Sequence, residues 1–189
     1  GFPNDASFAC YGMAEITLFT AGVRRKTKQK GKVAPCHLTP ELTELIAIVD
    51  PESHMLLTPG QEGEIWLRGP SQTEGYLNSY EDTLATFDHT LGGQMGWMRT
   101  GDLGYKLNDA LFIIGRIKEI VICNGRNIAA PEIEWLGCQQ HPSLNPMSAA
   151  AFSADPNTSE GAILIAELHS KDLTQQEIDE IRQKVRLAV

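Results

Sequence analysis

The chain has 189 residues, of which 42% are hydrophobic and 21% charged, so it can bury one sizeable core or two small ones. Its net charge of −8 and pI of about 5.1 disfavour a nucleic-acid partner, which needs a basic protein face to neutralise phosphates. No apolar run approaches the roughly 18 residues of a membrane span, and the chain does not open on a signal-peptide pattern. We therefore expect a cytoplasmic protein with no membrane span.

The first ten residues contain a proline and an Asn-Asp pair, show no periodicity, and lead directly into the dense motif Tyr11–Glu15. A domain seldom begins so close to such a motif, which favours a start cut from a longer protein. Further along, Arg24–Lys32 holds six of the 16 basic residues. We interpret this run as a solvated loop, with a patch that binds phosphate or an acidic partner as the alternative.

Short apolar runs separated by turn residues dominate the chain from residue 44 to residue 116. Strands are expected at Leu45–Val49 and Glu64–Arg68, and a hairpin at Tyr105–Ile114. A short helix is expected at Tyr80–Phe87, with Ser79 as its N-cap. Strands at such close spacing are typical of a small distorted barrel or meander.

Strand and helix patterns follow one another beyond Arg116. The expected elements are strands at Ile120–Cys123, Ser148–Phe152 and Ala162–His169, and helices at Pro131–Gln140 and Gln175–Leu187. Thr174 and Glu177 form a capping box for the last helix. We predict a mixed α+β or α/β fold: a β-rich, barrel-like part followed by a small α/β domain. The charged Lys118, placed between two apolar runs, marks the junction.

Four motifs carry residues suited to chemistry. They are Tyr11–Glu15 (YGMAE), Gly63–Tyr76 (GEIWLRGPSQTEGY), Arg99–Asp102 (RTGD) and Gly115–Glu134 (GRIKEIVICNGRNIAAPEIE). In this order and at these intervals they resemble motifs of the adenylate-forming superfamily, which includes acyl-CoA synthetases, luciferases and peptide-synthetase adenylation domains. Each motif alone is weak, but four in series over about two-thirds of the chain are specific. YGMAE and NGRN most resemble the fatty-acyl-AMP ligases.

This resemblance implies a division into domains. Residues 1–116 would be the C-terminal part of a large AMP-binding domain, β-rich from about residue 40. Residues 117–118 would form a hinge, with Lys118 as its pivot, and residues 119–189 a small, mobile, truncated α/β domain. The phosphate loop of the family would precede Gly1, and its catalytic lysine would follow Val189. We therefore expect this fragment to be inactive on its own.

The resemblance also implies a reaction, in which a fatty-acid carboxylate attacks the ATP α-phosphate, pyrophosphate leaves and an acyl-adenylate forms. By motif position, Tyr11 would stack on adenine, with Gly12 beside it in the nucleotide site. Asp102 would accept both ribose hydroxyls. Glu15 would hold Mg²⁺ near the phosphates, and Arg116 would reach the ribose or phosphate side, where a forked, permanently charged guanidinium suits the developing charge.

Each of these residues has a plainer interpretation. Tyr11 could be a core aromatic, Glu15 a surface residue, and Arg116 the partner of Glu119 in an exposed ion pair. Asp102 follows Thr100-Gly101 and could cap that turn. Asn124-Gly125 could be a hairpin turn or a loop on the side of the thiol acceptor.

The sequence is thus identified as similar to a fatty-acid-activating ligase that uses ATP and Mg²⁺, with an acyl-carrier-protein thiol as the expected acceptor. An acyl-CoA synthetase is the alternative enzyme, because the segment Val23–Glu44 is short and basic where fatty-acyl-AMP ligases carry an insertion. A nucleotide- or acyl-binding module without catalysis is the alternative from another class.

Overall fold

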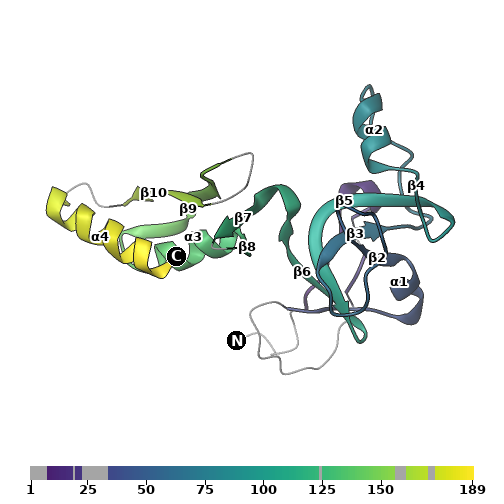
Figure 1. Ribbon diagram of the computed structural model, residues 1–189, viewed down its shortest axis with the longest axis horizontal. Coiled ribbons are helices and arrows are strands. Elements are labelled where there is room, and N and C mark those ends of the chain that lie inside the picture. Colours follow the sequence, from purple (N-terminus) through teal and green to yellow (C-terminus); the bar gives the residue numbers. More distant parts are fainter. Residues whose placement is uncertain (1–7, 19, 23–33, 124, 156–160, 170–172) are drawn as a thin grey trace. The chain divides into compact units, whose positions relative to one another are not determined.

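The computed structural model describes residues 8–18, 20–22, 34–123, 125–155, 161–169 and 173–189 (Figure 1). The basic run Arg24–Lys32 lies outside them. The chain forms two compact units, Gly1–Ile117 and Lys118–Val189, and each is described here by itself. Strands dominate the first unit and the second combines strands and helices, which confirms the expected mixed α/β class.

The first unit is built on a six-stranded antiparallel sheet. Its strands are β1 (Cys36–His37), β2 (Ile46–Val49), β3 (Gly63–Leu67), β4 (His89–Leu91), β5 (Gln94–Leu107) and β6 (Ala110–Arg116). The strand order is β1-β6-β5-β3-β2, and β4 also pairs with β5. Figure 1 shows β5 curving along its length. The helices are α1 (Pro40–Glu44), α2 (Tyr80–Thr86) and a 3-10 turn, Ala14–Ile16.

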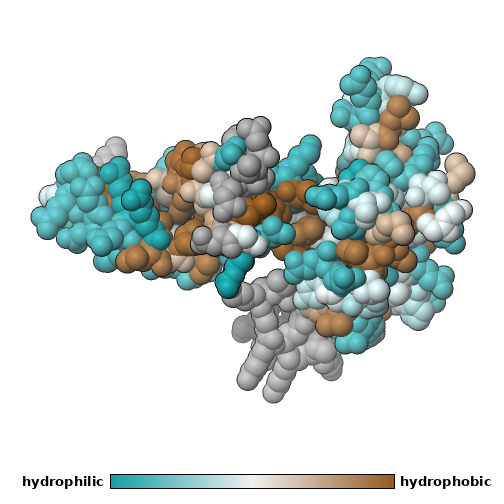
Figure 2. All heavy atoms as spheres, in the orientation of Figure 1, coloured by the Kyte–Doolittle hydropathy of each residue, from teal (hydrophilic) through white to brown (hydrophobic). Residues whose placement is uncertain are grey.

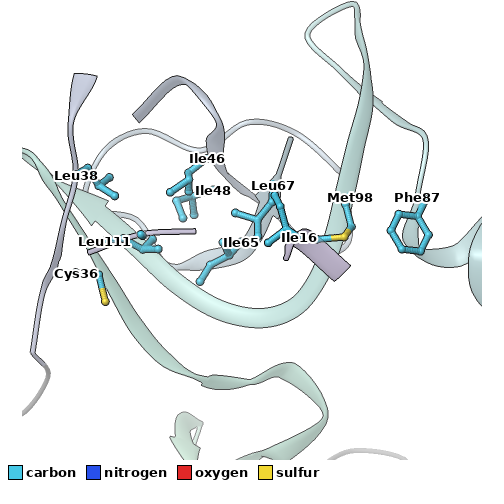
Figure 3. Packing of buried hydrophobic residues seen from close by; sticks show 11 residues of the cluster. Ile16, Cys36, Leu38, Ile46, Ile48, Ile65, Leu67, Phe87, Met98 and Leu111 are labelled. Carbon is cyan, nitrogen blue, oxygen red and sulfur yellow. The ribbon is translucent and has the colours of Figure 1, made fainter. Parts of the chain in front are cut away.

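Both faces of β2 and β3 are covered. Ile46 and Ile48 of β2 point into one core with Ile65 and Leu67 of β3 (Figure 3). Successive side chains of a strand point to opposite faces, so the alternate residues, Trp66 among them, enter a second cluster. Strands buried on both faces favour continuous apolar runs, which is why IAIV and EIWL could be recognised.

Several elements of the first unit differ from expectation. The hairpin turns at Asn108 as predicted, but β5 extends back beyond the predicted start at Tyr105 as far as Gln94. Strand β1 and helix α1 were not predicted. Ser79 occupies the N-cap position of α2 without capping it, because its hydroxyl donates to the Asp82 carboxylate.

The second unit consists of two hairpins and two helices. Its elements are β7 (Ile120–Cys123), β8 (Arg126–Ala129), α3 (Ala130–Cys138), β9 (Leu144–Ser153), β10 (Ala162–Leu168) and α4 (Gln175–Ala188). Strand β8 was not predicted. The predicted capping box of α4 is confirmed: the Glu177 N–H donates to Thr174 Oγ1 at 3.3 Å, and the Thr174 N–H donates to Glu177 Oε2 at 2.8 Å.

The core of the second unit is small. Ile133 of α3 and Ile181 of α4 are buried in it. Gly137 lets α3 approach β10 closely, because a Cβ at this position would lie 2.4 Å from Leu164 Cδ2. The outward surface of α4 is largely hydrophilic (Figure 2). Among the residues that the structure describes, no helix of either unit is long and apolar enough to span a membrane.

Candidate functional site

A bulge in β5 positions Asp102. Glu64 of β3 lies opposite Leu103 and Trp66 opposite Arg99, so Ile65 alone faces the three residues from Thr100 to Asp102. Gly101 lies in the left-handed region at φ 70°, which glycine adopts without steric cost. Such a bulge bends a strand and redirects its side chains.

Thr100 replaces ladder hydrogen bonds that the bulge interrupts. Its buried hydroxyl donates to the Ile65 carbonyl at 2.6 Å and accepts the Asp102 N–H at 3.0 Å. Both backbone groups are thereby satisfied, as buried polar groups require. The threonine of the RTGD motif is therefore a structural part of the bulge.

The Asp102 carboxylate joins three segments that are distant in sequence. The Tyr11 hydroxyl donates to Oδ2 at 2.5 Å, and the Arg116 Nε donates to Oδ1 at 3.2 Å. Arg116 is directly opposite Asp102 in the β5–β6 ladder. Asp102 is only 8% exposed, whereas the Arg116 side chain is 60% exposed. A nearly buried anion thus has a charged partner that reaches solvent.

Both the backbone and the ring of Tyr11 make contacts that fix its position. Its N–H donates to the Ala21 carbonyl at 2.7 Å, and its ring packs against the core cluster of the first unit. Burial, and then the hydrogen bond to Asp102, raises the pKa of the Tyr11 hydroxyl far above its usual range. The hydroxyl therefore stays protonated and acts as a donor. Arg116, which was also considered as the partner of Glu119 in an ion pair, binds Asp102.

Glu15 is paired with another tyrosine. The Tyr76 hydroxyl donates to Glu15 Oε1 at 2.8 Å, and the Thr73 N–H donates to the Glu15 carbonyl at 2.8 Å. The Tyr76 ring meets Phe87 edge-on, with 5.3 Å between the centroids. Desolvation, and then the hydrogen bond to Glu15, raises the pKa of Tyr76. These contacts tie the Tyr11–Glu15 motif to the Gly63–Tyr76 motif.

Glu15 suits Mg²⁺ by donor type. Across the described part of the chain, no group of three or more His, Cys, Asp or Glu residues converges on a metal position. Magnesium bound together with a nucleotide commonly takes only one or two carboxylates, and phosphates and waters supply the other ligands. A single half-buried carboxylate such as Glu15 fits that mode of binding.

The other predicted site residues lie as follows. Gly12 is exposed next to Tyr11. Lys118 is exposed in the 3-10 turn Ile117–Glu119, where the second unit begins. Gly125 is exposed in the β7–β8 turn at φ 72°, and Asn124 is outside the described residues. The structure thus brings Tyr11, Asp102 and Arg116 together, whereas Lys118 and Gly125 belong to the other unit.

Four residues of these motifs contribute to the site although no individual role was predicted for them: Glu64, Tyr76, Arg99 and Thr100. Glu64 was marked in the sequence by its charge, since it opens an apolar run that becomes a fully buried strand. A carboxylate in that position indicates a buried partner. Nothing local pointed to Tyr76, because its contact with Glu15 spans 61 residues.

Comparisons with known proteins agree with the motifs. The family model of AMP-binding enzymes matches residues 2–77. Over its whole length the chain is 32% identical to the medium-chain-fatty-acid–acyl-carrier-protein ligase JamA of Moorena producens, of which it covers 36%. Over 76% of its length it is 34% identical to 4-coumarate–CoA ligase-like 2 of Arabidopsis thaliana, of which it covers 24%. The chain therefore spans between 24% and 36% of the length of these relatives.

A solved structure gives the same result for the fold. A chain from a study of fatty acyl-adenylate ligases of E. coli and L. pneumophila superposes with a TM-score of 0.73. It is 25% identical to this chain, and the match covers 97% of this chain and 36% of the other.

Proposed function

Because this chain belongs to the superfamily of AMP-binding, adenylate-forming enzymes, we propose that it is part of a ligase that uses ATP to activate a fatty acid. An oxygen of the fatty-acid carboxylate attacks the ATP α-phosphorus. The bond from that phosphorus to the oxygen bridging to the β-phosphate breaks, and pyrophosphate leaves. The observation that carries this proposal is the Asp102 carboxylate, bound by Tyr11 and Arg116 from two other motifs.

Asp102 is assigned to the two ribose hydroxyls. Each carboxylate oxygen can accept more than one hydrogen bond, so the contacts with Tyr11 and Arg116 leave acceptor capacity on both oxygens. Because Asp102 is nearly buried, a ribose hydroxyl that finds no hydrogen bond there loses binding free energy. The site therefore selects nucleotides that carry these hydroxyls. The Tyr11 ring is assigned to the adenine face, with Gly12 beside it.

Arg116 is assigned to the ribose or phosphate side. A guanidinium has five N–H donors, of which the Nε–H binds Asp102. The side chain is 60% exposed, so its terminal nitrogens can reach a ligand. Positive charge there would stabilise the charge that develops on the phosphates in the transition state.

Glu15 is assigned to Mg²⁺, which would neutralise phosphate charge when bound with ATP. The hydrogen bond from Tyr76 fixes one oxygen of Glu15, so the carboxylate is oriented in advance. Preorganisation of this kind reduces the ordering cost of binding.

An acyl-carrier-protein thiol is the proposed acceptor, based on the likeness to JamA along the whole chain. The β7–β8 turn with Asn124 and Gly125 is assigned to the acceptor side. The likeness to a CoA ligase-like protein of Arabidopsis supports CoA as a second candidate. Incubating the full-length protein with ATP, a labelled fatty acid, and either CoA or a phosphopantetheinylated carrier protein decides between them.

The domain assignment is also part of the proposal. Residues 1–116 belong to the large nucleotide-binding domain and residues 119–189 to a small mobile domain, with the hinge at residues 117–118. In support, the boundary between the two compact units falls between Ile117 and Lys118 in the sequence. The 189 residues alone should not catalyse the reaction, since they span about a third of a catalytic relative.

The test is ATP–pyrophosphate exchange dependent on a fatty acid, measured on the full-length protein with the 189-residue chain as a control. Exchange by the long protein and background by the short one are expected. Nucleotide binding by the full-length protein without exchange for any carboxylic acid would instead identify a binding module without catalysis.

A further inference from the structure

Glu64 is a buried carboxylate to which the proposed reaction assigns no role. It is 1% exposed and accepts hydrogen bonds from three residues. The Trp66 Nε1–H donates to Oε2 at 3.0 Å, and the Gly101 N–H donates to Oε1 at 3.1 Å. Arg99 contributes an ion pair, with its Nη2 at 2.9 Å and its Nε at 3.0 Å from Oε2. A charge this deeply buried needs such a set of donors.

These contacts act on the bulge that carries Asp102. Arg99 and Gly101 flank Thr100, and both bind the same carboxylate on β3. Thr100 itself binds the Ile65 carbonyl. Three consecutive residues of β5 are therefore fixed to two consecutive residues of β3, and Asp102 follows immediately.

We propose that Glu64 and Arg99 are positioning residues for nucleotide recognition, which hold the bulge in the conformation that directs Asp102 to the ribose hydroxyls. This inference rests on the proposed function, in which Asp102 binds ribose. Gly101 needs such a restraint because a glycine has no Cβ to limit its backbone conformations. A displacement of about 1 Å at a binding carboxylate can reduce the rate by about 10²-fold.

A purely structural ion pair makes a different prediction. If Glu64 and Arg99 only stabilised the sheet, their loss would lower the melting temperature and affect every nucleotide alike. If they act through Asp102, their loss should matter for nucleotides with ribose hydroxyls and should not matter once Asp102 is disabled.

The experiment uses pyrophosphate exchange by the full-length protein with ATP and with 2′,3′-dideoxy-ATP. Wild-type protein should prefer ATP. Glu64→Gln, which keeps the side-chain size and removes the charge, should lower kcat/KM for ATP on the order of tenfold and change that for the dideoxy nucleotide by less than about twofold. Asp179→Asn is the matched control, because it removes the same charge from an exposed ion pair with Arg182 in the other unit. It should leave both values unchanged.

A double mutant provides the second test. Glu64→Gln added to Asp102→Asn should cause no loss of ATP use beyond that of Asp102→Asn alone, as expected for residues that act through one another. Additive losses would overturn the positioning role. Should Glu64→Gln fail to fold, Arg99→Lys replaces it, since the Arg99 side chain is 28% exposed and lysine keeps the charge without the fork.

The outcomes separate the two proposals. A wild-type enzyme that uses ATP and the dideoxy nucleotide equally well would contradict ribose binding by Asp102, and the positioning role with it. A wild-type preference for ATP that Asp102→Asn abolishes and Glu64→Gln leaves intact would contradict the positioning role alone.

Discussion

The two units differ in how deeply the residues of their strands are buried. Every residue of β2 and β3 in the first unit is buried, whereas every residue of β9 and β10 in the second is at least partly exposed. Strands enclosed on both faces can hold a buried charge such as Glu64 and keep the neighbouring bulge in a fixed geometry. Of the residues proposed to recognise the nucleotide, Asp102 lies on β5, directly beside the enclosed strand β3, and Arg116 lies opposite it on β6.

The second unit is suited to another task. Its residues Ile163 and Ile165 are 40% and 60% exposed, and its described part has fewer buried hydrophobic residues than that of the first unit. Elements with few buried contacts open more readily than enclosed ones. The proposed hinge at Lys118 and the acceptor-side turn at Gly125 both belong to this unit, as expected for a domain that moves.

Truncation of a buried leucine tests the comparison most directly. Leu67→Ala should destabilise the chain by about 2–5 kcal/mol, since Leu67 is fully buried and the cavity cannot collapse completely. Ile165→Ala in the second unit should change stability by less than about 0.5 kcal/mol. Urea unfolding followed by circular dichroism measures both, and similar losses for the two variants would contradict the difference in enclosure.

Removal of the Asp102 carboxylate should affect function more than folding. In the full-length protein, Asp102→Ala should lower kcat/KM for ATP on the order of 10²-fold, at about 1–3 kcal/mol for each ribose hydroxyl left unpaired. The variant should still fold, although loss of the acceptor of Tyr11 and Arg116 should lower its stability by about 1–3 kcal/mol.

The matched control for Asp102 is an aspartate that does cap a turn. Asp50 accepts the N–H groups of Glu52 and Ser53, so Asp50→Ala should affect stability and leave nucleotide use intact. If Asp102→Ala instead lowers the melting temperature strongly and keeps the KM for ATP, then Asp102 caps a turn, as Asp50 does, and does not bind ribose.

Proline at position 118 tests whether the boundary between the units is a hinge. A pivot absorbs a large change in φ and ψ, and proline fixes φ near −65°, so it permits one pose and denies the other. In the full-length protein, Lys118→Pro should keep one half-reaction within about tenfold of wild type and depress the other far more. Adenylation and thiol transfer are measured separately, and equal loss in both would exclude the hinge.

The sequence predicted those elements whose signal is local. The apolar runs IAIV and EIWL became β2 and β3, and Thr174 with Glu177 formed the capping box. It failed where tertiary structure overrides local preference. Strand β5 continues through Gly96 and Gly101, because pairing with β3, β4 and β6 holds a segment that turn-forming residues would otherwise break.

The site was predictable only in part for a related reason. Tyr11 and Asp102 could be grouped through the series of motifs, although 91 residues separate them. The role of Glu64 depends on strand register: it meets Arg99 and Gly101 only because β5 carries extra residues opposite β3. No pattern within either segment determines that register.

The smallest expected effect is the loss of stability when the N-cap residue of one helix in each unit is replaced. In α4 the Thr174 side chain accepts the Glu177 N–H, so Thr174→Ala should destabilise the second unit by about 1 kcal/mol. Ser79 stands at the same position of α2, but its hydroxyl binds Asp82 and caps no backbone N–H, so Ser79→Ala should cost less. Trp66 and Trp97 are buried in the first unit, whereas Trp135 of the second unit is already 58% exposed. The change in tryptophan fluorescence on unfolding therefore reports mainly on the first unit, and circular dichroism follows both. Thr174→Ala should therefore shift the circular dichroism transition more than the fluorescence transition. A larger loss from Ser79→Ala would mean that its contact with Asp82 stabilises α2 more than a cap stabilises α4.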